Sequence, residues 1–220
     1  MPRSRRSIGR NRWWATKLLI CGLPVITAMA VLGLVSTWGM QPLSYIAHGR
    51  MMTPGFETQG LVVAAYTALA FAIGATAGLL SRSTVAAMAV TIGLYLALLV
   101  VVGGTRADYL DPVESYGTVV EGAAPGSQGS RSLVPADAWR VGTRYFDDKG
   151  SEVDFNPSSC KDSDGTIENC LQRQGIAGLS ARYHPDNQFW NLQLIESGVF
   201  LAISGALLGV GGWALRKRSF

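Results

Sequence analysis

Four long apolar blocks constrain this chain more than any other feature of its sequence. Each block holds 18 to 22 residues; the first three contain no Asp, Glu, Lys or Arg, and the fourth contains only Glu196. A hydrocarbon core about 30 Å thick is crossed by about 20 apolar residues in a helix, with roughly 17–25 tolerated. We therefore predict a membrane all-α protein with four transmembrane helices, at Leu18–Trp38, Leu61–Leu80, Val85–Val102 and Leu194–Leu215.

Positive charge predicts which side of the membrane holds the termini. Ten of the 19 Lys and Arg residues fall in three short segments that four crossings place on one side: before the first span, between the second and third, and after the last. An excess of Lys and Arg is typical of cytoplasmic segments. We predict a multi-pass cell-membrane protein with both termini cytoplasmic and no nucleic-acid partner. A basic tail that binds anionic lipid or RNA is the alternative interpretation of these residues.

The segment between the third and fourth spans differs sharply from the rest. Residues 105–187 hold 13 of the 15 carboxylates against 8 basic residues, a net charge of −5. Short runs typical of strands occur at Trp139–Val141, Arg144–Phe146 and Gly178–Tyr183, and Asp148–Gly150 has the composition of a turn. We predict a small extracytoplasmic domain here, of mixed α/β or β-rich type.

These observations predict the organisation of the whole chain. The expected parts are a basic cytoplasmic segment at 1–17, three spans within 18–104, an extracytoplasmic domain at 105–190, and a fourth span with a basic cytoplasmic tail at 191–220.

Two of the three cysteines lie in the predicted outer domain. An extracytoplasmic compartment permits disulfides, so we expect Cys160 to pair with Cys170, while Cys21 lies inside the first span. Closing a loop of about ten residues stabilises a fold by on the order of 2–3 kcal/mol. Two free thiols are the alternative.

Within the spans, glycine pairs and one carboxylate stand out. Gly74 and Gly78, like Gly205 and Gly209, are one helical turn apart, and small residues let neighbouring helices approach closely. We expect these faces to pack on helices. Glu196 is the only ionisable group inside a span, which makes it a functional candidate by default. Its place near the outer surface, at the positive end of its helix, favours a structural or interfacial role.

Motifs for catalysis are missing from the sequence. It contains no phosphate-binding glycine loop followed by Lys and Ser or Thr, no His-Glu-x-x-His, no nucleophile elbow and no paired-cysteine zinc spacing. We therefore expect no enzyme activity, no cofactor and no metal site.

Three stretches resemble actinobacterial ABC-type exporter permeases, the transmembrane subunits of such transporters. They are Ser7–Leu19, with the sequence SIGRNRWWATKLL; residues 70–91, which include GLLSRSTVAAMAVT; and Arg182–Pro185 through Phe189, Trp190, Gln193, Glu196 and Phe200. The resemblance implies a six-span family whose first two spans this chain lacks, either as a truncation, as half of a split permease or as a remnant.

Two functions follow as hypotheses. The resemblance implies a membrane-spanning subunit, or part of one, of an ABC-type export system powered by a separate ATP-binding-cassette ATPase. Its partners would be the lipid bilayer, that ATPase, and either further copies of this chain or a second membrane chain. The alternative is a non-transport membrane-anchored protein whose outer domain binds or senses an envelope ligand.

Overall fold

The computed structural model describes residues 10–40, 50–81, 83–118, 133–160 and 167–217. The Gly, Ser, Ala and Pro content of 122–132 predicts a loop, which lies outside these residues. The chain divides into two compact units, which we call the helical unit (1–40, 57–106 and 190–220) and the sheet unit (41–56 and 107–189). The long helices are α1 (Arg10–Met40), α3 (Val62–Leu80), α4 (Thr84–Gly104) and α7 (Phe189–Lys217), with a short α2 at Gly55–Thr58.

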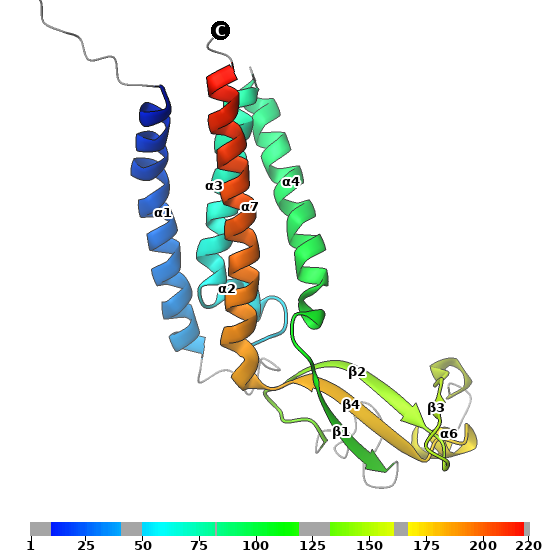
Figure 1. Ribbon diagram of the computed structural model, residues 1–220. Helices are drawn as coiled ribbons and strands as arrows, with labels where there is room; N and C mark the ends of the chain where they lie inside the picture. The colour runs from blue at the N-terminus through cyan, green and yellow to red at the C-terminus, as the bar shows by residue number, and fades with distance from the viewer. Residues whose placement is uncertain (1–9, 41–49, 82, 119–132, 161–166, 218–220) are drawn as a thin grey trace, which may run out of the picture. The chain divides into compact units, whose positions relative to one another are not determined.

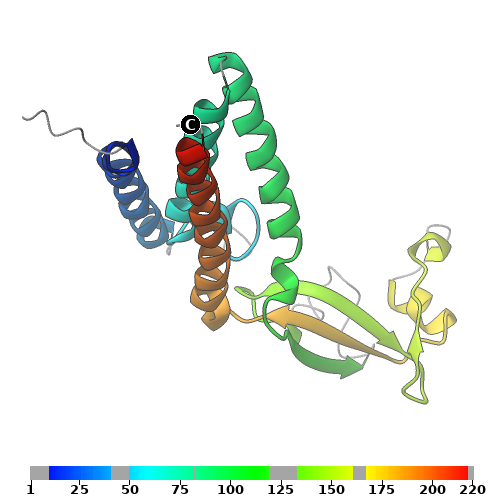
Figure 2. The ribbon, with the colours of Figure 1, turned by 45° about the horizontal axis from the view of Figure 1, so that its top comes forward.

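The four long helices alternate in direction along the bundle (Figures 1 and 2). The start of α1, the link from α3 to α4 and the end of α7 therefore lie at one end. That end carries Arg12, Lys17, Arg216 and Lys217, so we call it the basic end and its opposite the far end. Lys17 lies 4.1 Å from the ring centroid of Trp13, and Lys217 lies 4.2 Å from that of Trp213.

The predicted fold class is confirmed. Among the described residues, four helices are long and apolar enough to cross a membrane, and a small antiparallel sheet lies between the third and fourth of them in the chain. Most large side chains of α4 are exposed, including Val85 and Val100, because apolar groups on a membrane helix face lipid or other spans rather than water. The division into domains remains a prediction.

Helix α3 is the most buried of the four and packs against both α1 and α4. Its buried face includes three alanines, Ala65, Ala68 and Ala72, whose small side chains let the neighbouring helices come close. At the far end the contact becomes backbone to backbone. The Gly60 N–H donates to the Gly33 carbonyl at 3.0 Å and to the Thr37 hydroxyl at 2.7 Å.

This contact depends on a glycine in α1. A Cβ at Gly33 would lie 2.2 Å from the Gly60 carbonyl oxygen, far inside van der Waals distance. Gly60 itself has φ of +70°, which only glycine adopts readily. The two glycines together bring α1 and the start of α3 within hydrogen-bonding distance.

The sheet unit holds four antiparallel strands in the order β1-β4-β2-β3. The strands are β1 (Val113–Thr118), β2 (Trp139–Phe146), β3 (Glu152–Val153) and β4 (Gly178–His184). β2 and β3 join at the turn predicted around Asp148–Gly150, where Asp147 accepts backbone hydrogen bonds from Lys149 and Ser151. The strands expected near residues 139–146 and 178–183 are confirmed, whereas β1 was not anticipated.

One face of the sheet is apolar and covered. Tyr145 and Leu179 on this face pack with Leu171 and Ile176, which lie within and just after the short helix α6 (Ile167–Arg173). Ala181 extends the core with residues before β2. Burial raises the pKa of the Tyr145 phenol.

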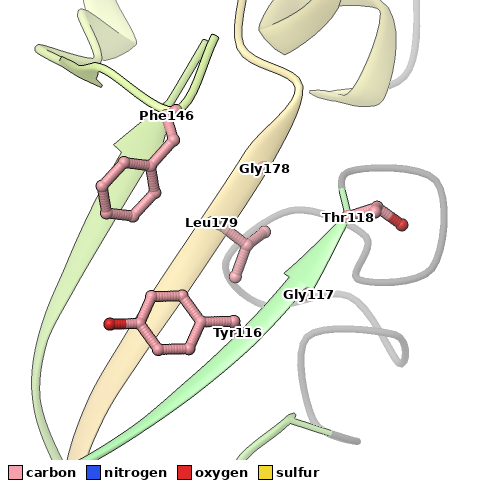
Figure 3. Close-up of a pocket in the computed structure, with 7 residues that line it drawn as sticks. Tyr116, Gly117, Thr118, Phe146, Gly178 and Leu179 are labelled. Atoms are coloured by element: carbon pink, nitrogen blue, oxygen red, sulfur yellow. The ribbon is translucent and has the colours of Figure 1, made fainter. Parts of the chain in front are cut away.

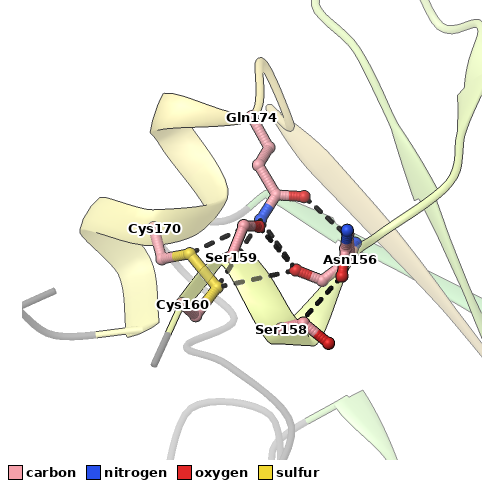
Figure 4. Close-up of a disulfide and its surroundings, with 6 residues drawn as sticks. All are labelled: Asn156, Ser158, Ser159, Cys160, Cys170 and Gln174. Atoms are coloured by element: carbon pink, nitrogen blue, oxygen red, sulfur yellow. Dashed lines mark hydrogen bonds between the residues drawn. A yellow bond between two sulfur atoms is a disulfide. The ribbon is translucent and has the colours of Figure 1, made fainter. Parts of the chain in front are cut away.

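The predicted disulfide between Cys160 and Cys170 is present (Figure 4). It links the turn of 3-10 helix η3 (Pro157–Cys160) to α6, with Cα atoms 5.7 Å apart, inside the usual range. The Gln174 amide donates to the Asn156 carbonyl at 3.1 Å and to the Ser159 hydroxyl at 2.9 Å, and thus ties the same two segments together. Cys21 is free.

We predict that Gly33→Ala destabilises the protein. The added methyl cannot coexist with the Gly60 carbonyl, so α1 must move away and the backbone contact is lost. Overpacking of this kind costs about 1–3 kcal/mol. The measurement is thermal unfolding of the purified protein in mild detergent.

Gly39→Ala is the matched control. It lies on the same helix, and no described atom comes within 4 Å of its Cβ position. Replacing a helical glycine by alanine there is expected to be neutral or stabilising, by up to about 1 kcal/mol. Equal unfolding temperatures for the two variants would contradict the close approach of α1 and α3.

Candidate functional site

Four polar side chains meet inside the far end of the helical unit. Arg106 follows directly after α4, Glu196 lies two turns into α7, Tyr66 lies in the second turn of α3, and Glu57 is on α2. Three helices therefore contribute to one cluster, which we call the far-end network. Its members are separated by up to 139 positions in the sequence, so only tertiary packing brings them together.

The centre of the far-end network is a two-pronged ion pair. The Arg106 Nε lies 2.7 Å from Glu196 Oε2, and its Nη2 lies 3.1 Å from Oε1. Two parallel bonds match the planar guanidinium to the planar carboxylate and fix their relative orientation. The Glu196 side chain is fully buried and that of Arg106 is 5% exposed, so water contributes almost nothing to their solvation.

Glu57 and Tyr66 complete the network. Arg106 Nη1 lies 2.9 Å from Glu57 Oε1, and the Tyr66 hydroxyl donates to Glu196 Oε1. The Tyr66 ring packs edge-to-face on the buried Phe200 of α7, with centroids 4.9 Å apart. Both carboxylate oxygens of Glu196 thus accept hydrogen bonds, which is what a buried charge requires.

A second contact lies one turn before Glu196. The Gln193 Oε1 accepts from the Val62 N–H at 2.8 Å, and its Nε2 donates to the Gln59 carbonyl at 3.0 Å. The first N–H groups of a helix lack partners within it, and the N-cap residue Leu61 offers no side-chain acceptor. Gln193 on α7 therefore caps α3.

Sequence reasoning found one member of this site and missed the others. Glu196 was expected to be stabilised by its helix terminus, whereas the structure gives it Arg106 and Tyr66 as direct partners. One signal was available: a carboxylate inside a span needs a cation, and Arg106 is a basic residue within a few positions of a span end. The functional role of Glu196 remains a prediction.

The four glycines predicted to pack on helices have different surroundings in the structure. A Cβ at Gly74 would lie 3.8 Å from the Thr91 side chain on α4, an ordinary contact. At Gly78, Gly205 and Gly209 no described atom lies within 4 Å of that position. Their packing on helices therefore remains a prediction that requires a second chain. Inside this chain, α1 instead approaches α3 closely at Gly22, against Phe71, and at Gly33.

No metal site is found among the described residues, where no three His, Cys, Asp or Glu side chains gather in a suitable group. His184 in the sheet unit is fully buried, with its Nδ1 2.7 Å from Gln188 Oε1 and its Nε2 3.1 Å from the Ala107 carbonyl. Both ring nitrogens are thus engaged in structural hydrogen bonds.

We predict that removing one partner of the buried ion pair is costly, while removing both is less so. Arg106→Leu leaves Glu196 as an uncompensated buried charge, worth about 3–5 kcal/mol. Glu196→Leu leaves Arg106 with Glu57, 2.9 Å away, as its carboxylate partner, so its loss is expected to be smaller. In the double variant the Arg106 and Glu196 charges disappear together, so its loss is expected to be smaller than the sum of the single losses. Thermal unfolding in detergent, followed by circular dichroism, measures all three.

The control for this cycle is Arg144→Leu in the sheet unit. Its guanidinium is 44% exposed and its carboxylate partners lie 3.7 and 4.0 Å away. Exposed pairs contribute about 0–1 kcal/mol. If Arg106→Leu unfolded at the same temperature as Arg144→Leu, the far-end network would stabilise the protein no more than an exposed ion pair does. If the effects of Arg106→Leu and Glu196→Leu simply added in the double variant, the two side chains would not stabilise each other.

Comparison with known protein families gives a match. Residues 4–106 match the model of a family described as "ABC-2 membrane transporter related". The match covers α1, α3 and α4 and ends at Arg106. No curated protein matches the chain. No solved structure matches it.

Proposed function

We propose that this chain is a membrane-spanning subunit, or part of one, of an ABC-type export system whose ATP is hydrolysed by a separate ATPase subunit. The observation that carries the proposal is the match of residues 4–106 to an ABC-2 transporter-related family. That family supports a permease component of an ABC transporter. The four apolar helices agree with it, since such a component must cross the bilayer.

The orientation is part of the proposal. Arg12, Lys17, Arg216 and Lys217 gather at the basic end, and an excess of Lys and Arg is typical of the cytoplasmic side. We place the basic end in the cytoplasm, within reach of an ATPase, and the far end and the sheet unit outside. The disulfide supports this, because disulfides persist in oxidising compartments.

In this orientation the far-end network lies at the outer end of the span bundle. A transporter that opens to one side at a time needs a seal at the other. The Arg106–Glu196 pair joins the ends of α4 and α7 through two short bonds, and Tyr66 adds α3. We propose that this network holds the outer end of the transport path closed. Since four spans are few to enclose a path, the working unit includes further copies of the chain or a second membrane chain.

The orientation predicts the outcome of thiol labelling on intact cells. In a Cys21→Ser background, Lys149→Cys in the exposed turn before β3 is expected to react with a membrane-impermeant maleimide added from outside. Thr84→Cys at the start of α4 is expected to react only after permeabilisation. The reverse pattern would overturn the orientation and the seal with it.

The proposed ATPase partner predicts the outcome of a co-purification experiment. A tagged chain extracted from its native membranes in mild detergent is expected to carry a subunit with the phosphate-binding Gly-x-x-x-x-Gly-Lys-Ser/Thr motif, and the sample is expected to hydrolyse ATP. Replacing the lysine of that motif in the partner should abolish hydrolysis and leave the association intact. Recovery of envelope proteins without any ATPase would favour the membrane-anchored ligand-binding alternative.

A further inference from the structure

The second face of the sheet carries a pocket, lined mainly by residues of β1, β2 and β4. Paired residues of antiparallel strands point to the same side, so the register places Tyr116, Ser180 and Arg144 in one row across β1, β4 and β2. The next row on this face holds Thr118, Gly178 and Phe146. These rows alternate with the row that holds Gly117 and Leu179, and at this end of the sheet those two residues also line the pocket.

The pocket has a volume of about 490 Å³, within the range of small-ligand sites, about 300–1,000 Å³. Gly178 on the central strand forms part of its floor; a Cβ there would meet only the Gly117 carbonyl, at 3.6 Å, among the described atoms. Because Gly178 has no side chain, a gap lies between Thr118 on one side and Phe146 on the other. Figure 3 shows the Tyr116 and Phe146 rings beside this gap.

The two aromatic rings form one wall. Their centroids are 6.3 Å apart and their planes are tilted by 46°, and Tyr116 is 67% exposed. Large aromatic side chains exposed together on a water-soluble surface mark interaction sites more often than scattered single ones. The face of an aromatic ring is electronegative and attracts the slightly positive C–H groups of a ligand.

The charges around the pocket neutralise one another. Arg182 lies 3.2 Å from Glu114, and Arg144 lies 4.0 Å from Glu114 and 3.7 Å from Glu152. Among the described residues, these two cations face two carboxylates, and the Tyr116 hydroxyl donates to Glu114 Oε2 at 2.7 Å. This pairing fits a neutral ligand, and the paired groups form a polar rim because each retains further donor or acceptor capacity.

We propose that this pocket binds a neutral sugar ring. A pyranose has one face of C–H groups, which suits the Tyr116 and Phe146 rings, and a rim of hydroxyls, which suits the polar edge. The rim offers hydrogen-bonding atoms that a purely hydrocarbon ring could not use. A charged ligand would have to displace existing ion pairs.

The test is saturation-transfer difference NMR on the full chain in lipid nanodiscs, with methyl β-glucoside, N-acetylglucosamine and indole as separate probes. We expect transfer to the ring C–H protons of at least one of the two sugars. The signal should be lost in Tyr116→Ala, which removes the wall, and in Gly178→Val, which fills the floor. Valine suits a strand, and the Cβ contact of 3.6 Å at this position is ordinary, so Gly178→Val should fold.

Val113→Ala is the control, on the same strand but on the opposite face by alternation, and it should keep the signal. Circular dichroism and the intact disulfide verify the fold of each variant. Transfer to neither sugar would overturn the proposal, as would equal transfer in the parent and in correctly folded Gly178→Val. Transfer to indole alone would overturn the sugar assignment. Because none of these readouts involves the ATPase, failure here leaves the proposed transport function untouched.

Discussion

A buried charge in a helix bundle must find its counter-charge inside the protein, and the far end of this bundle is arranged around that requirement. Glu196 is fully buried on α7, and Arg106 after α4 supplies two bonds to it. Apolar contacts between membrane helices are weakly directional, because lipid solvates the same surfaces equally well. The ion pair and the Gln193 cap, one turn apart on α7, specify which side of α7 faces α3.

The fold class could be predicted from the sequence because it depends on composition alone. A run of about twenty uncharged apolar residues has few alternatives to a membrane helix. Two cysteines in one acidic segment outside the spans have few other partners for a disulfide. The Arg106–Glu196 pair, the Gln193 cap and the Gly33–Gly60 contact were not found, because each joins residues far apart in the chain. Glycine spacing pointed to Gly78 and Gly209, yet close approach depends on what lies opposite, which spacing does not encode.

The two faces of the sheet have different roles: one contributes to stability and the other carries the proposed ligand pocket. Its apolar face packs Tyr145, Leu179 and Leu171 into a core, and the disulfide closes the neighbouring segment. Its other face carries the exposed Tyr116 ring, the half-buried Phe146 ring and paired charges, and exposed ion pairs contribute little to folding. Substitutions on that face can therefore alter ligand binding without unfolding the unit. In antiparallel sheets, one face commonly packs on the core while the other faces solvent.

The far-end network also bears on the order of events in biosynthesis. Arg106 and Glu57 leave the ribosome long before Glu196, which follows Arg106 by 90 positions. Until α7 is made, Arg106 has only Glu57 of its two carboxylate partners, and the start of α3 lacks the Gln193 cap. The far end of the bundle therefore completes its polar contacts only once α7 is in place.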